Sequence, residues 1–123
     1  MNEPTDLPSG SEQSLRIVRD ARAEAVVLAV AGDIDAFTVS GLTNAVADVL
    51  AEGPRMLVLD LSAVSFLASA GLSALLTIHR DAADTGVLRI VANGPATLRP
   101  IQLTGLDRSL PLYPTLEASL AQP

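Results

Sequence analysis

Short apolar runs recur along the chain, and their composition predicts strands. The runs at 14–20 and 25–30 are rich in β-branched residues and flank the polar stretch "DARAE", so they are predicted to pair as antiparallel strands. The run at 56–62 is nearly continuous, which is typical of a strand buried on both faces, and the run at 87–93 has the same character. A last run at 109–113 is predicted to be an edge strand.

Other segments follow the three-and-four spacing of an amphipathic helix. One helix is predicted over 38–52, because its apolar residues share one helical face and Gly53-Pro54 supplies a stop. A second helix follows Ser69, with one polar face and an opposite apolar face. Together with the central strand, this helix predicts a buried core that includes Leu59, Leu61, Leu72, Leu75 and Ile78.

The last third of the chain predicts two shorter helices. One begins near Thr97, which leaves Pro100 in the first turn, and one closes the chain at 115–121. The whole order of elements predicts an α/β fold, a mixed and mainly parallel sheet of about five strands packed with about four helices. Residues 1–13 are predicted to be a disordered tail, and residues 14–123 a single domain.

Composition narrows the classes of function. The net charge is −6, all eight basic residues are Arg, and only three residues are aromatic, which argues against a nucleic-acid partner. Without cysteine there is no disulfide or thiolate metal site, and we expect neither a metal nor a cofactor. The longest apolar run, "AVVLAVAG", is far shorter than the roughly 18 residues of a membrane span. We therefore expect a cytoplasmic protein.

Ser69 is the residue with the most chemical interest, because it lies between an apolar strand and an apolar helix. It could be the N-cap of that helix, since serine is favoured there. A hydrolase nucleophile is disfavoured, because Gly-x-Ser-x-Gly would need a glycine where Leu67 stands, although Gly71 is present. The only histidine, His79, is ten residues further along the same helix, about 15 Å away, and is predicted to be a partly buried structural residue.

Two segments resemble a known family. "GDIDAFT" at 32–38 and "DLSAVSFLASAGL" at 60–72 are similar to the two signatures of the STAS domain of bacterial anti-sigma factor antagonists. The resemblance covers about 15–120 and implies the STAS fold. In the family, the second signature ends in Asp-Ser-Ser/Thr-Gly-Leu, and the first serine of that ending corresponds to Ser69 here. The resemblance implies that this serine is phosphorylated by a partner that is both a serine kinase and an anti-sigma factor.

Within the second signature, Phe66, Gly71 and Leu72 match the family pattern. The family has an Asp before the phosphorylated serine and a Ser or Thr after it, whereas this chain has Ala68 and Ala70. The resemblance implies that the segment around Asp33 lies near the phosphorylation site. The predicted partner-binding residues are Asp33, Asp35, Thr38, Ala68, Ser69, Ala70, Gly71 and Ser73.

These observations predict a binding protein rather than an enzyme. The first hypothesis is an anti-sigma factor antagonist that binds the anti-sigma factor when unphosphorylated, releases a sigma factor, and is switched off by phosphorylation at Ser69. A serine phosphatase would then restore it. The alternative is a STAS-type regulatory module that is not phosphorylated and responds to a small ligand or another protein. For Asp35 and Thr38 a structural role is also open, because either side chain could simply cap the helix that follows instead of binding a partner.

Overall fold

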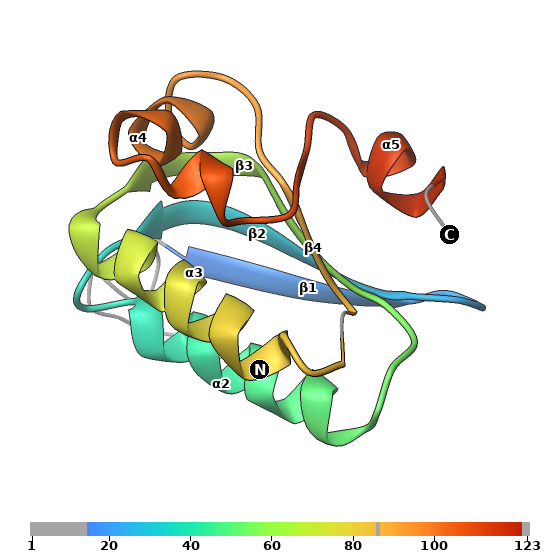
Figure 1. Cartoon of the computed structure of the whole chain (residues 1–123). Coiled ribbons are helices and arrows are strands. Elements are labelled where there is room, and N and C mark those ends of the chain that lie inside the picture. Colours follow the sequence, from blue (N-terminus) through green and yellow to red (C-terminus); the bar gives the residue numbers. More distant parts are fainter. Residues whose placement is uncertain (1–14, 86, 122–123) are drawn as a thin grey trace.

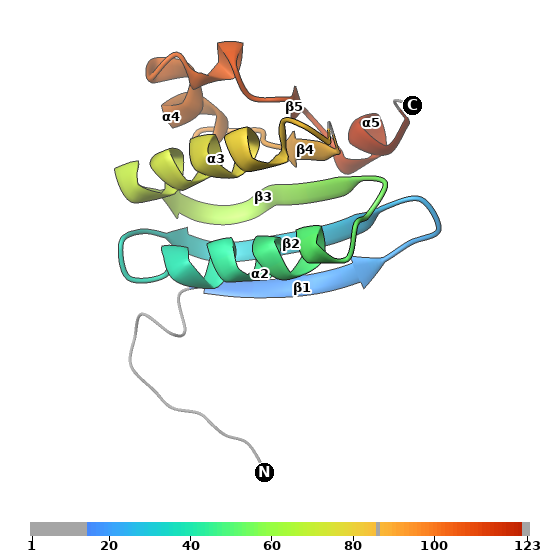
Figure 2. The ribbon, with the colours of Figure 1, turned by 60° about the horizontal axis from the view of Figure 1, so that its bottom comes forward.

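The computed structural model describes residues 15–85 and 87–121 (Figure 1). The tail predicted at 1–13 lies outside the described residues. Over the described ranges, the chain forms one five-stranded sheet with helices packed around it (Figure 2). The strands are β1 (Leu15–Ala21), β2 (Val26–Ile34), β3 (Leu57–Leu67), β4 (Leu88–Val91) and β5 (Leu112–Tyr113). The helices are α2 (Val39–Ala51), α3 (Ser69–Ala82), α4 (Leu98–Leu103) and α5 (Leu116–Ala121), with a single 3₁₀ turn η1 (Leu106–Arg108).

Strand order in the sheet follows the chain, β1-β2-β3-β4-β5. β1 is antiparallel to β2, whereas the pairs β2–β3, β3–β4 and β4–β5 are parallel. The predicted α/β fold with a mixed, mainly parallel sheet is therefore confirmed. A parallel arrangement places the carboxyl ends of β2, β3 and β4 at one edge of the sheet, and the loops that follow them gather there.

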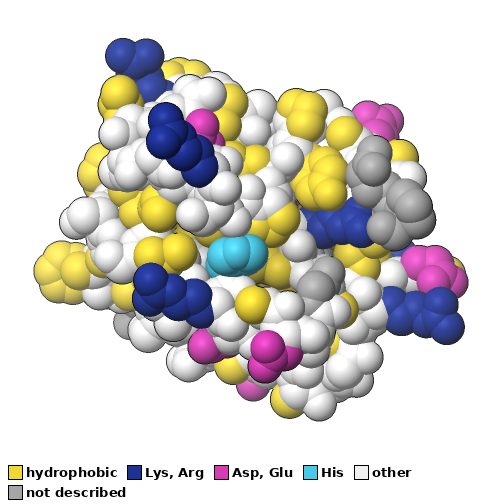
Figure 3. Space-filling view, in the orientation of Figure 1, with side chains coloured by type: hydrophobic (Ala, Val, Ile, Leu, Met, Phe, Trp, Pro, Cys, Tyr) yellow, Lys and Arg dark blue, Asp and Glu magenta, His cyan; other side chains and the backbone are white. Residues whose placement is uncertain are grey.

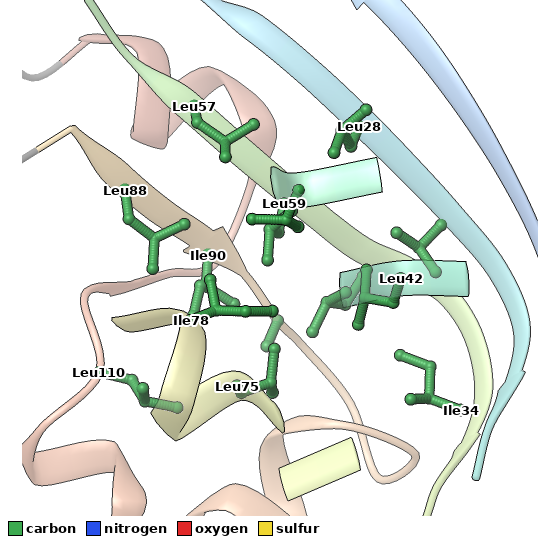
Figure 4. Close-up of a cluster of buried hydrophobic side chains, with 14 of the residues drawn as sticks. Leu28, Ile34, Leu42, Leu57, Leu59, Leu75, Ile78, Leu88, Ile90 and Leu110 are labelled. Atoms are coloured by element: carbon green, nitrogen blue, oxygen red, sulfur yellow. The ribbon is translucent and has the colours of Figure 1, made fainter. Parts of the chain in front are cut away.

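The main core lies between the sheet and the helices α2 and α3, which lie side by side on one face (Figures 1 and 2). Leucine and isoleucine side chains from β2, β3 and β4 meet those of the two helices there (Figure 4). On the opposite face, α5 packs against a smaller cluster built on Val27, Val58 and Val91. Because the chain has few aromatic residues, large aliphatic side chains fill its interior instead.

Three details of the expected core and strands are corrected. Leu59, Leu61, Leu75 and Ile78 are buried as predicted, but Leu72 is only partly buried. Each residue is rotated by about 100° around the helix axis relative to the one before it, so Leu72 lies about 60° away from Leu75. Leu72 is therefore at the border of the buried face rather than at its centre. β3 also continues to Leu67, beyond the predicted end at 62, and β5 covers two residues rather than five.

The length of β3 has a structural cause. Its pairing with β2 shifts register twice, once between Ala29 and Ala31 and once between Gly32 and Asp33, so that β3 carries extra residues at both places. Such bulges bend a strand and re-aim its side chains. Beyond Leu61, the buried positions of β3 therefore come every third residue, at Val64 and Leu67, instead of every second.

Candidate functional site

The segments that carry the two signatures meet at the carboxyl ends of β2 and β3. Asp33 pairs with Phe66 and Ile34 with Leu67 in the parallel ladder. The backbone N–H of Ala68 then donates a hydrogen bond to the carbonyl of Ile34 at 2.9 Å. The first turn of α3 is thus fastened to the end of β2, beside the loop that leads into α2.

Hydrogen bonds within the loop give it a defined shape. The Asp35 Oδ1 accepts hydrogen bonds from the backbone N–H groups of Phe37 at 2.9 Å and Thr38 at 3.1 Å. The Thr38 hydroxyl donates to the Asp33 carbonyl at 2.8 Å and accepts from the Asp35 N–H at 2.9 Å. The Asp35 carboxylate therefore holds the turn before α2, whereas Thr38 is the N-cap residue of α2 but makes no side-chain cap and instead closes the loop from a buried position.

Ser69 is the first residue of α3 and is exposed to solvent. The N-cap position belongs to Ala68, whose backbone is extended with φ −83° and ψ 172° and whose methyl group cannot cap. The predicted N-cap role of Ser69 is therefore not observed. Among the described residues, the Ser69 hydroxyl has no hydrogen-bond partner. It is left accessible at the positive end of a helix of 14 residues.

Gly71 has a steric role beneath this surface. A Cβ atom at this position would lie 2.6 Å from Leu67 Cδ1 and 2.7 Å from Ile34 Cγ2, both side chains of the core. Only a residue without a side chain allows α3 to start so close to the sheet. The glycine of the signature therefore determines how far the preceding Ser69 stands from the sheet.

The remaining predicted site residues are brought together, but not all of them reach the surface. Asp33, Asp35, Ala68 and Ala70 are half-buried, and Ser73 is exposed one turn after Ser69. Thr38 and Gly71 are buried, so they shape the site from within. The surface formed by the end of β2 with the loop after it (33–38), the end of β3 at Phe66 and the first turn of α3 is called the Ser69 surface below.

Two residues of the Ser69 surface were missed as site residues by the sequence analysis. Phe37 in the loop is 82% exposed, and Phe66 before the helix is 54% exposed. A signal for them was present, since two of the three aromatic residues of the chain fall within the signature segments. No local sequence pattern marks these two side chains as exposed.

The structure offers little support for catalysis at Ser69. His79 is half-buried and lies in the same continuous helix, ten residues on, which corresponds to about 15 Å. The described part of the chain contains no group of three or more His, Cys, Asp or Glu side chains that could hold a metal ion. Within the same ranges, every helix is too short or too polar to cross a membrane.

Comparison with known proteins agrees with this geometry. Residues 16–119 match the STAS domain family. The chain is 42% identical over 94 residues to the anti-sigma-F factor antagonist RsfB of Mycobacterium tuberculosis, covering 76% of this chain and 77% of the relative. A crystal structure of an anti-sigma factor antagonist from Mycobacterium paratuberculosis superposes with a TM-score of 0.83 at 41% identity, covering 93% of this chain and 96% of that one.

A more distant structure shares the fold. The Bacillus cell fate determinant SpoIIAA in its phosphorylated form superposes with a TM-score of 0.61 at 19% identity, over 86% of this chain and 96% of that one. The family match spans both signature segments and nearly all of the described sheet. The chain belongs to the STAS-domain family of anti-sigma factor antagonists.

Proposed function

We propose that this chain binds an anti-sigma factor when Ser69 is unmodified, and that phosphorylation of Ser69 by that partner's serine-kinase activity ends the binding. Binding would free the sigma factor held by the anti-sigma factor, and a serine phosphatase would restore the binding form. The observation that carries the proposal is an exposed serine hydroxyl at the start of α3, without a hydrogen-bond partner in the described part of the chain, beside Asp33 and Asp35. Such an exchange of partners would take place in the cytoplasm, where transcription occurs.

The electrostatics of the Ser69 surface support a switch of this kind. A phosphate adds about −1.5 to −2 charges at neutral pH. In the free protein, water and the N–H groups at the start of α3 stabilise this charge. At an interface the water is displaced, and the phosphate adds to the negative charge of Asp33 and Asp35. The modification should therefore weaken binding without disturbing the fold.

Ala68 and Ala70 influence how a phosphate would be accommodated. An aspartate at the N-cap would accept hydrogen bonds from the first turn and place a negative charge next to the modified serine. Ala68 makes no side-chain cap, so within the described residues the Ser69 and Ala70 N–H groups stay available to a phosphate on Ser69, whereas the Gly71 N–H already donates to the Ala68 carbonyl at 2.9 Å. These two alanines also favour the second candidate, a STAS module that is not phosphorylated, because the usual neighbours of the serine are absent.

The test is incubation of the chain with its anti-sigma kinase and ATP, followed by intact mass measurement and calorimetric titration. We expect one phosphate on wild type, none on Ser69→Ala, and at least a tenfold loss of partner affinity in the phosphorylated form, about 1.4 kcal/mol. Ser69→Ala should bind like wild type, and Ser69→Asp should imitate the phosphate partly, with one charge. If the phosphorylated chain binds as tightly as wild type, or if no phosphate is added, the switch at Ser69 is wrong and the second candidate takes its place.

A further inference from the structure

Exposed apolar side chains concentrate at the end of the molecule that holds Ser69. In the described ranges, four large hydrophobic side chains are exposed, namely Val18, Phe37, Phe66 and Leu103. Three of them lie on segments at the carboxyl ends of the parallel strands, since α4 and the start of α3 lie at the same end of the sheet in both ribbon views (Figures 1 and 2). Hydrophobic side chains project at that end of the space-filling view (Figure 3).

The exposure of Phe66 is a product of the β3 bulges. Leu67 is the buried anchor at the end of the strand, and the two residues before it, Ser65 and Phe66, both face solvent. A regular strand would alternate its side chains and bury every second residue. The register shift between Gly32 and Asp33 is therefore what directs an aromatic ring outward, three residues before Ser69.

An apolar groove adjoins Phe66. It has a volume of about 450 Å³ and is lined by Ser65, Phe66, Leu67, Pro95, Ala96 and Pro100. The lining comes from the end of β3, from the segment between β4 and α4, and from Pro100 in α4, so the groove lies outside the carboxyl ends of two adjacent parallel strands. Its lining holds no charged side chain among the residues described, which suits an apolar side chain better than an ionic ligand.

The backbone beneath both aromatic rings is held in place. Phe66 belongs to a paired strand, and the Phe37 N–H donates to the Asp35 carboxylate at 2.9 Å. An aromatic side chain on a fixed backbone has only two torsion angles to fix on binding and so loses little conformational entropy, and such residues dominate the energetics of many protein interfaces. Asp33 and Asp35 provide negative charge next to them, so the surface is complementary to an apolar patch with a basic residue at its border.

We propose that Phe37, Phe66 and the adjoining groove form the apolar centre of the surface that binds the anti-sigma factor. The partner inserts an apolar side chain into the groove and places a basic side chain against Asp33 and Asp35. This inference rests on the proposed function and adds where the binding energy comes from. It also explains how a phosphate acts, because a charge on Ser69 would have to be desolvated at the border of this apolar centre.

The test is titration of the anti-sigma factor with Phe37→Ala, Phe66→Ala and the control Val18→Ala. Val18 is 63% exposed, like the two phenylalanines, but lies on β1 away from the Ser69 surface. Each phenylalanine variant should bind at least tenfold more weakly than wild type, whereas Val18→Ala should bind within twofold. Because all three side chains are exposed, far-ultraviolet circular dichroism and the melting temperature should stay close to wild type, and this is measured for each variant.

A fourth variant, Asp33→Asn, tests whether a basic side chain of the partner contacts Asp33. It should slow association and reduce the dependence of affinity on salt concentration. If both phenylalanine variants bind like wild type while phosphorylation still weakens wild type, the apolar centre is wrong and the proposed function stands. If wild type itself does not bind the anti-sigma factor, the proposed function fails and this inference fails with it. An equal loss in Val18→Ala also overturns the inference, because the effect is then not specific to the Ser69 surface.

Discussion

Replacing Gly71 by alanine should separate the steric demand of this site from helix propensity. Both Gly71 and Gly41 lie within helices, in α3 and α2 respectively. At Gly71 a new Cβ would meet Leu67 Cδ1 at 2.6 Å, Ile34 Cγ2 at 2.7 Å and Ile34 Cβ at 3.3 Å. At Gly41 it would meet only Leu15 Cδ2, at an ordinary distance of 3.9 Å. The same substitution therefore causes a steric clash at Gly71 and none at Gly41.

Their effects on stability should have opposite signs. Alanine is favoured over glycine in a helix by about 1 kcal/mol, and this gain applies to both sites. At Gly71, overpacking costs about 1 to 3 kcal/mol, and the neighbours have little room to give way because Ile34 and Leu67 are buried in the core. We therefore expect Gly41→Ala to stabilise the protein by up to about 1 kcal/mol. Gly71→Ala should be destabilising by about 1 to 2 kcal/mol after the helical gain is subtracted.

Urea unfolding at equilibrium, followed by circular dichroism, measures both values on the same scale. The dependence of the unfolding free energy on urea should stay equal to that of wild type, which shows that the compactness of the unfolded state is unchanged. Gly71→Ala should also move the first turn of α3 away from the sheet, so partner affinity should fall even where the protein is fully folded. If Gly71→Ala stabilises the protein as much as Gly41→Ala, the close packing of α3 on Ile34 is refuted.

Three further measurements test the fold and its charges. Leu75→Ala should cost about 2 to 5 kcal/mol in a urea melt, because the side chain is fully buried between α3 and the sheet, and a loss under about 1 kcal/mol would contradict this packing. Ala68→Asp should raise stability by about 0.5 to 2 kcal/mol by capping α3; it should also weaken the stabilisation of a phosphate on Ser69, and an unchanged melting temperature would contradict the capping. The pKa of Glu52 is held below its usual range by its hydrogen bonds from Arg19, so the ion pair contributes stability above the pKa of a free glutamate and loses it as the pH falls through the lowered pKa. The difference in melting temperature between wild type and Glu52→Gln should therefore shrink under acidic conditions, and a difference that does not change with pH would contradict this assignment.

Local sequence patterns determined most of the secondary structure of this protein. Helices α2 and α3 were predicted from residues three and four apart, because a helix exposes and buries the same face at every turn. The strands β1 to β4 were indicated by apolar and β-branched runs, and the order of elements determined the α/β class. Ser69 was identified by its place in a signature segment, which is likewise a local feature.

Tertiary structure decided which residues reach the surface and what surrounds them. Asp33 and Ser69 are 36 positions apart, and only the parallel pairing of β2 with β3 brings their segments together. Two bulges in β3 change which side chains are buried, so Phe66 is exposed and β3 extends to Leu67. The N-cap of α3 is Ala68 and not the predicted Ser69. The Ala68 N–H is hydrogen-bonded to the end of β2, and this contact between distant segments fixes the start of the helix. Register and close packing depend on contacts between distant segments, and the periodicity within one segment carries no information about them.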